Sequence, residues 1–121
     1  MNERASVIKI GGKEHELLLT TRATKEISKK YGGLGKMGEK LEKSESTEDS
    51  LADAIWIICL LANQVILRHN FENPNDTKPL LTEEYIELYT LPGDFEEFSA
   101  AITNAIYNGT RRDVPTGEEK N

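Results

Sequence analysis

Near the start of the chain, two apolar segments flank a pair of glycines and a charged run, a pattern that predicts a β-hairpin. The largely apolar stretch Val7–Ile10 precedes Gly11-Gly12, and the apolar run Leu17–Leu19 follows a charged one. Glycine adopts positive φ at little cost, so we expect a hairpin over about residues 6–19 with its turn around Gly11–Lys13. An isolated hairpin is marginally stable in water, so it should pack against helices or against another chain.

Helical spacing of apolar residues predicts four to five helices after the hairpin. Thr20 or Thr21 can cap the first helix, and glycines end it, while Gly35 and Gly38 weaken the second. Asp94 with Glu97 three residues later has the form of a capping box for the last helix. The expected helices cover residues 22–31, 34–43, 48–69, 82–90 and 94–109.

The stretch from Leu51 to Leu67, LADAIWIICLLANQVIL, is the least polar part of the chain and has three interpretations. A membrane span needs about 20 largely apolar residues, whereas Asp53 and Asn63-Gln64 leave an uninterrupted run of less than half that length. Apolar residues surround this helix instead of forming one stripe, which favours a nearly enclosed core helix. The third interpretation is a flank left uncovered for a partner, because contiguous exposed apolar surface marks interaction sites. We favour a helix that combines the second and third roles.

These patterns define the expected fold class and domain organisation. The chain should be mainly α, with an N-terminal β-hairpin and a small bundle of four to five helices around the central apolar helix. We expect a single domain over residues 1–109 and a disordered polar tail over residues 110–121.

Charge is unevenly distributed along the 121 residues, whose net charge is −6. Residues 1–43 hold ten Lys/Arg and six Asp/Glu, a net charge of +4, so the remainder carries −10. An acidic chain is a poor phosphate binder, since nucleic-acid affinity comes largely from cations. The first residues, MNERASVIKI, contain no apolar signal core, and Cys59 is the single cysteine. We therefore expect a cytoplasmic protein without a membrane span or a disulfide.

No pattern in the sequence points to catalysis, a cofactor or a metal. Gly11-Gly12 precedes Lys13 without completing a phosphate-binding loop, and a hairpin turn accounts for these glycines. His15 and His69 lack cysteines or carboxylates at ligand spacing. Cys59 has apolar neighbours, where a thiol acts as a small hydrophobe, not as a nucleophile. We expect a non-enzymatic protein.

The order of these elements resembles the tail assembly chaperones of long-tailed phages and of prophages in Gram-positive bacteria. The resemblance covers about Val7 to Arg112. It rests on the overall pattern and on segments such as TTRATKEISKKYGGL, LLANQ and LLTEEYIELYTLPGDFEEFSAAITNAIYNGT. It implies a protein that coats the tape measure protein, keeps it soluble and helps to recruit tail tube subunits. Such a protein acts in the host cytoplasm and is absent from the mature virion.

Helix-in-groove recognition would suit this role, because a free tape measure exposes apolar helical stripes. The expected anchors are Ile55, Trp56 and Cys59 on the third helix and Phe95 and Phe98 on exposed parts of the last one. Each of these five residues fits a position in the hydrophobic core at least as well as a role as a binding anchor. The oligomeric state is left open, including a homo-oligomer.

Two other functions fit the same pattern. A small DNA-binding regulator would use the first two helices as a helix-turn-helix, with phosphate contacts from lysines such as Lys25 and Lys29. The glycine-interrupted second helix makes a poor recognition element. A head–tail connector or completion protein would have a similar size and would remain in the particle.

The last two residues generate a prediction that the gene sequence can check. Members of the resembled family are made in a short and a longer form by ribosomal slippage near the end of the short reading frame. A slippery heptamer such as A-AAA-AAC would encode Lys120-Asn121 when read without slipping. The hypothesis is that these codons are the slip site; codons that cannot realign in the shifted frame would exclude it.

Overall fold

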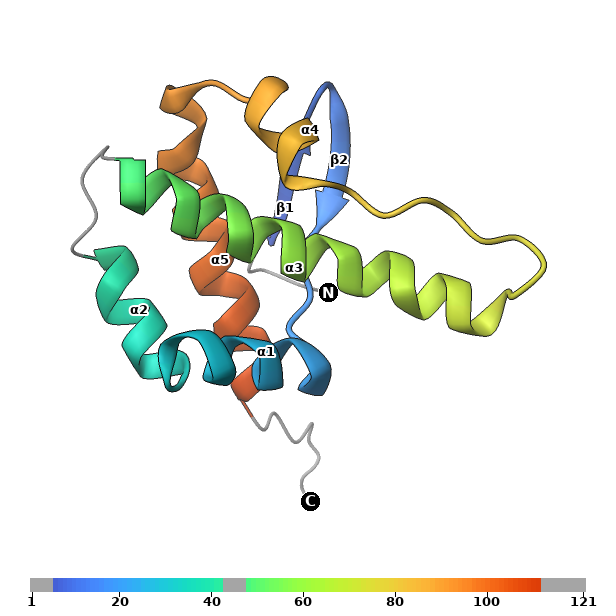
Figure 1. Cartoon of the computed structure of the whole chain (residues 1–121), viewed down its shortest axis with the longest axis horizontal. Coiled ribbons are helices and arrows are strands. Elements are labelled where there is room, and N and C mark those ends of the chain that lie inside the picture. Colours follow the sequence, from blue (N-terminus) through green and yellow to red (C-terminus); the bar gives the residue numbers. More distant parts are fainter. Residues whose placement is uncertain (1–5, 43–47, 112–121) are drawn as a thin grey trace, which may run out of the picture.

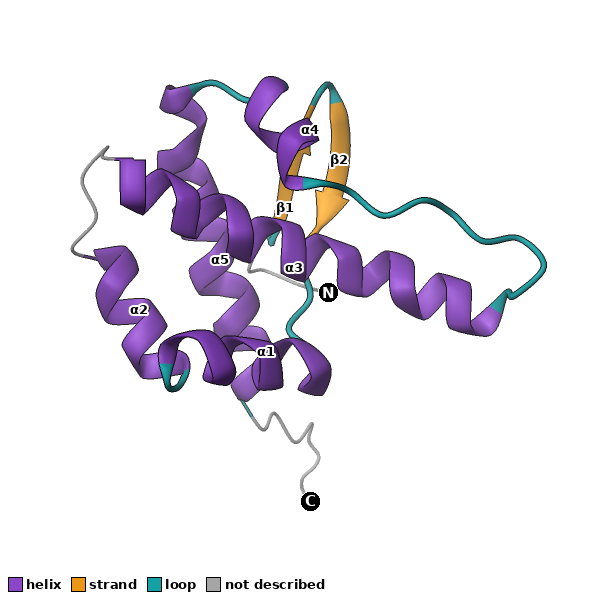
Figure 2. Cartoon of the chain, in the orientation of Figure 1, coloured by secondary structure: helices purple, strands orange, loops and turns teal. Residues whose placement is uncertain are grey.

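The fold is mainly helical with one N-terminal hairpin, which confirms the predicted fold class (Figures 1 and 2). The computed structural model describes residues 6–42 and 48–111. In chain order, the elements are β1 (Val7–Ile10), β2 (Lys13–Glu16), α1 (Thr21–Tyr31), α2 (Leu34–Glu42), α3 (Glu48–Glu72), α4 (Glu83–Leu88), the 3₁₀ turn η1 (Pro92–Asp94) and α5 (Phe95–Thr110).

The hairpin forms where the glycines predicted it. β1 pairs antiparallel with β2, from Val7 opposite Glu16 to Ile10 opposite Lys13. Gly11 and Gly12 make the turn with φ angles of 59° and 82°, a conformation that side chains on L-residues resist. Ile8 and Ile10 face inward and are buried, so the hairpin is stabilised by packing and not by its ladder alone.

Helix α1 begins and ends as its sequence predicts. The Thr20 hydroxyl accepts a hydrogen bond from the Ala23 N–H at 3.1 Å, and Gly32 ends the helix with a φ of 91°. The buried side chain of Gln64 ties this start to α3, since it accepts from the Thr20 hydroxyl and donates to the Leu60 carbonyl. A buried amide is thereby satisfied, as burial in an apolar setting requires.

Helix α3 crosses the whole molecule, and every other element lies against it or against a neighbour that does (Figure 1). Its most deeply buried side chains are Ile57, Ile58 and Leu61, each 0% exposed. The core that they share with the hairpin and the other helices also contains Ile8, Ile10, Leu17, Ile27, Met37, Ile86 and Ile102.

The prediction of a nearly enclosed α3 is right only between Ala54 and Gln64, where all of its buried positions lie. Beyond Gln64 no position of α3 is buried, and the helix continues to Glu72, three residues past the predicted end (Figure 1). By length and composition alone α3 could cross a membrane, a test that the core helix of a soluble protein also passes. Part of α3 is buried inside this fold, so its apolar character has a structural explanation.

An extended segment, residues 73–82, returns along the projecting end of α3 (Figure 1). Asn63 accepts from the Leu81 N–H at 2.8 Å and donates to the Leu81 carbonyl at 3.0 Å. Asn70, two turns later, makes the same pair of bonds with Lys78. The His69 ring nitrogen Nε2 lies 2.8 Å from the Asp76 carbonyl oxygen, so His69 also holds this loop.

The start of α5 differs from the predicted capping box. The Asp94 carboxylate accepts from the Leu91 N–H at 2.8 Å and makes no cap bond to α5 itself. Pro92 begins the 3₁₀ turn η1, and the Asp94 side chain closes that turn, although Asp94 still occupies the N-cap position of α5. The fourth helix is shorter than predicted, and α5 continues through Thr110, one residue past the predicted domain end. By sequence, Ser46 or Thr47 is expected to cap the third helix, but both residues lie outside the described part of the chain, as does most of the predicted tail.

Gly109 allows α5 to lie directly on the chain before α1. A Cβ there would lie 2.8 Å from the Leu19 Cβ and 3.0 Å from the Leu19 carbonyl oxygen. Replacing it with alanine should therefore lower the free energy of unfolding by about 1–3 kcal/mol, although alanine favours helix. Gly38→Ala in α2 is the matched control, since nothing lies within 4 Å of its Cβ position. That variant should gain up to about 1 kcal/mol in urea denaturation; equal effects at the two sites would contradict the close approach.

Candidate protein-binding groove

A groove lies between the first two turns of α3 and the segment that joins α4 to α5. On α3, Glu48, Leu51, Ala52 and Ile55 follow the spacing i, i+3, i+4, i+7 and therefore share one face. The opposite wall contains Glu87, Thr90, Leu91, Pro92 and Phe95, and the hollow measures about 360 Å³. We call this set of nine residues the apolar groove.

The apolar groove is open because its wall is a bent connection and not a continuous helix. Pro92 cannot continue α4, and the Asp94–Leu91 hydrogen bond fixes the turn that directs the chain into α5. Leu91 is left 70% exposed at the rim, while Ile55 is only 7% exposed at the floor. A buried floor with an accessible apolar rim is the arrangement that accepts an inserted side chain.

The structure places the five predicted anchors in four different environments. Ile55 and Phe95 line the apolar groove. Phe98 is not on an exposed part of the last helix, as the sequence suggested, because it is 2% exposed and belongs to the core. It supports the groove from behind, with its ring centroid 5.0 Å from that of Phe95.

Trp56 lies on another flank of α3, where α1 covers part of it. Its ring meets that of Tyr31 edge to face, with centroids 5.8 Å apart, and the Lys30 ammonium lies 5.1 Å from its centroid. The Tyr31 hydroxyl donates to the Asp53 carboxylate at 2.6 Å, and Lys40 lies 3.5 Å from the same carboxylate. Burial and Asp53 raise the pKa of Tyr31, so this hydroxyl stays protonated and keeps its bond.

Cys59 lies beside the returning segment. Its thiol donates to the Leu81 carbonyl at 3.4 Å and accepts from the Asn63 amide at 3.5 Å. The structure thus accounts for Trp56 and Cys59 by contacts within the chain, away from the groove.

Sequence reasoning did not select the groove residues Leu51, Leu91 and Pro92, nor the acidic Glu48 and Glu87. The signal for α3 was present, since Leu51 and Ile55 are four residues apart on one face. The signal for the other wall was weak, because Leu91-Pro92 reads as a loop whose position depends on tertiary packing.

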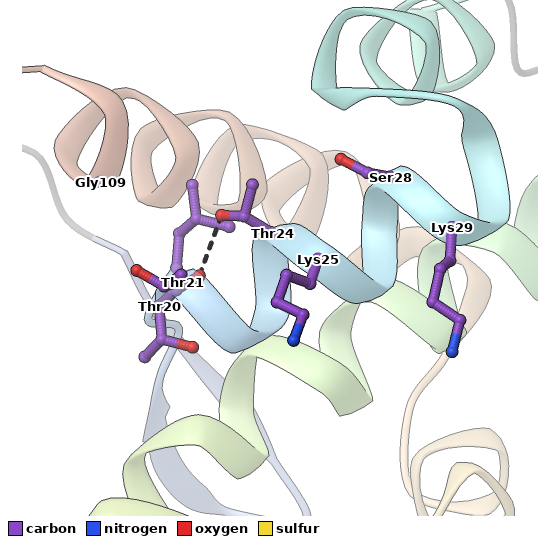
Figure 3. A pocket seen from close by; sticks show the side chains of 8 residues that line it. Thr20, Thr21, Thr24, Lys25, Ser28, Lys29 and Gly109 are labelled. Atoms are coloured by element: carbon purple, nitrogen blue, oxygen red, sulfur yellow. Dashed lines mark hydrogen bonds between the residues drawn. The ribbon is translucent and has the colours of Figure 1, made fainter.

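A second hollow, beside α1, is more polar and less suited to binding. It is lined by Leu19, Thr20, Thr21, Thr24, Lys25, Ser28, Lys29 and Gly109. The Thr24 hydroxyl already donates a hydrogen bond to the Thr20 carbonyl oxygen at 2.9 Å. The side chains of Lys25 and Lys29 do not converge on the serine and threonine hydroxyls (Figure 3). This arrangement does not form an anion site.

A third hollow lies at the outer end of α3, next to the almost fully exposed Phe71. Within the described part of the chain, no three His, Cys, Asp or Glu side chains are grouped to hold a metal ion.

Comparison with known proteins identifies no relative. No protein-family model matches the chain, and neither a curated protein nor a solved structure matches it.

The environment of Cys59 predicts that its thiol reacts slowly with alkylating reagents. Burial raises its pKa first and the nearby Glu83 raises it further, against a smaller lowering by the Asn63 hydrogen bond. A raised pKa leaves less thiolate at neutral pH, and only the thiolate reacts. Alkylation of the folded protein at pH 7.5 should be at least about tenfold slower than that of the urea-unfolded chain. Equal rates in the two states would show that Cys59 is a freely accessible surface residue.

Proposed function

We propose that this protein is a tail assembly chaperone of a long-tailed phage or prophage, which binds the tape measure protein and keeps it soluble. The observation that carries the proposal is the apolar groove, which a helical stripe of α3 lines on one side and Leu91, Pro92 and Phe95 on the other. A groove of this kind is suited to the apolar face of an amphipathic helix.

A tape measure protein presents such faces before the tail tube encloses it. Apolar stripes exposed in water cause aggregation, and covering them with a charged surface prevents it. The chain carries 21 Asp and Glu against 15 Lys and Arg, so a complex coated by it would remain strongly charged. The order of elements that resembles tail assembly chaperones supports the same partner.

The proposal assigns no chemistry to the protein. Its role is to bind in the cytoplasm of the host, to help recruit tail tube subunits, and to leave before the particle is complete. Recruitment and release come from the family resemblance, whereas the binding step is supported by the groove.

Co-expression with the tape measure gene of the same phage genome tests the proposal. The wild-type chain should increase the soluble fraction of the tape measure protein. Leu91→Ser should reduce this gain, because it removes an apolar side chain from the rim of the groove. Leu88→Ser is the matched control, since Leu88 is similarly exposed (72% against 70%) on the same short segment and does not line the groove.

Two results would count against the proposal. If the wild-type chain is soluble and the tape measure protein still precipitates, the chaperone role is wrong. If both leucine variants retain the gain equally, the apolar groove is not the binding site. Mass spectrometry of purified particles adds an independent check, because a chaperone should be absent and a head–tail connector present.

A further inference from the structure

Each wall of the apolar groove contains one acidic residue. Glu48 stands on α3 and Glu87 on α4, both are exposed, and both line the hollow. Neither is paired with a basic side chain among the described residues. The apolar floor is therefore bordered by two carboxylates that have no partner within the described fold.

The segments that build the groove contain no basic residue. Residues 48–55 and 82–97 hold nine Asp and Glu and no Lys or Arg, whereas the basic residues of the chain are concentrated in its first third. Among these acids Asp53 has a basic neighbour, since Lys40 of α2 lies 3.5 Å from it, but no basic residue lines the groove itself. A charged group that enters the groove therefore meets a predominantly negative lining.

Helix dipoles explain only part of this acidity. Glu48, Glu83, Glu84, Glu96 and Glu97 occupy first turns, where a negative charge is stabilising. Glu87 does not, because it is the last residue but one of α4, near the end where the dipole disfavours an acid. The contacts of the described residues reveal no stabilising role for Glu87 in the isolated fold.

We propose that the apolar groove binds an amphipathic helix whose apolar anchors are flanked by Lys or Arg. This inference rests on the proposed function, since it names the chemistry of the tape measure segment that docks here. The anchors lie over Leu51, Ile55 and Phe95. The basic heads reach the carboxylates at the rim, with their methylene stems along the apolar walls.

The charge pattern separates this occupant from two others. The segment after Arg111, RDVPTGEEKN, has Val114 as its one branched apolar side chain, and its three acids against two basic residues give a net charge of −1, so it offers neither a row of apolar anchors nor a basic flank. A small apolar molecule could fill the floor, but it gains nothing from the carboxylates. A basic amphipathic helix uses both features of the site.

Two synthetic helical peptides test the inference on the full chain. They share the same leucines at i, i+3, i+4 and i+7, and their flanking positions are lysine in one and glutamate in the other. Fluorescence anisotropy at low salt should show the lysine peptide binding at least about fivefold more tightly. The difference should shrink at high salt, since exposed ion pairs are screened.

Charge reversal assigns the preference to the groove. Glu48→Lys with Glu87→Lys should reverse the order of the two peptides. Glu14→Lys with Glu39→Lys changes the net charge equally at exposed sites on β2 and α2 and should leave the order unchanged. If the double groove variant unfolds, Glu87→Lys alone replaces it, because a cation suits the end of α4.

Three outcomes overturn the inference: equal affinity of the wild-type chain for both peptides, no binding of either, or the same reversal in the control variant. Its failure is distinct from that of the proposed function. A tape measure protein that becomes soluble without any peptide discrimination would refute only the charge preference. Peptide discrimination without any gain in tape measure solubility would refute the chaperone role and leave the preference of the groove intact.

Discussion

The burial of one face of α3 is the interaction on which the rest of the structure depends. Ile57, Ile58 and Leu61 are fully buried and contact both the hairpin side and the helical side of the core. Each such side chain contributes about 1.5–3 kcal/mol by leaving water, against a total stability of about 5–15 kcal/mol for a domain of this kind. The short hairpin and the six-residue α4 could not persist alone. They are ordered because α3 offers them an apolar surface.

The same helix provides the groove, and the two roles are separated along and around it. The middle third of α3 is covered by the rest of the fold. Its last third projects, and Asn63 and Asn70 bind the segment 73–82 to the helix. Its first two turns face the bent connection at Pro92. The groove is therefore a consequence of packing a straight helix against a chain that cannot continue as one. The groove is backed by the core, since the buried Phe98 packs against Phe95. A groove that is already formed lowers the ordering cost of binding on the side of this protein.

The architecture could be predicted from the sequence because its signals are local. Gly11-Gly12 requires positive φ, Thr20 is a cap, and the apolar run of α3 is unmistakable, so the hairpin and the helices follow from short-range rules. One error has a local cause and the other a long-range one. Asp94 was assigned to the following helix because Asp-x-x-Glu is a capping pattern, yet Pro92 creates a turn that uses its carboxylate first. Phe98 reads as a possible surface aromatic until the approach of α3 buries it.

The binding surface was harder to predict, since it combines residues about 40 positions apart. Ile55 and Phe95 were selected as apolar residues of the right helices, but nothing local shows that they meet. By sequence Trp56 and Cys59 are equally suitable, and only the tertiary structure places Tyr31 beside Trp56 and Leu81 beside Cys59. The composition of the two segments shows that they are acidic. Only the structure shows that their carboxylates border the same groove.

Hydrogen–deuterium exchange of the chain with and without the tape measure protein tests the central claim most directly. If the uncovered flank of α3 is the site of binding, protection should increase in peptides that cover residues 48–56 and 86–97. Exchange in the hairpin and at the projecting end of α3 should stay the same. A footprint on α1 or on the hairpin, with residues 48–56 and 86–97 unchanged, would contradict the account.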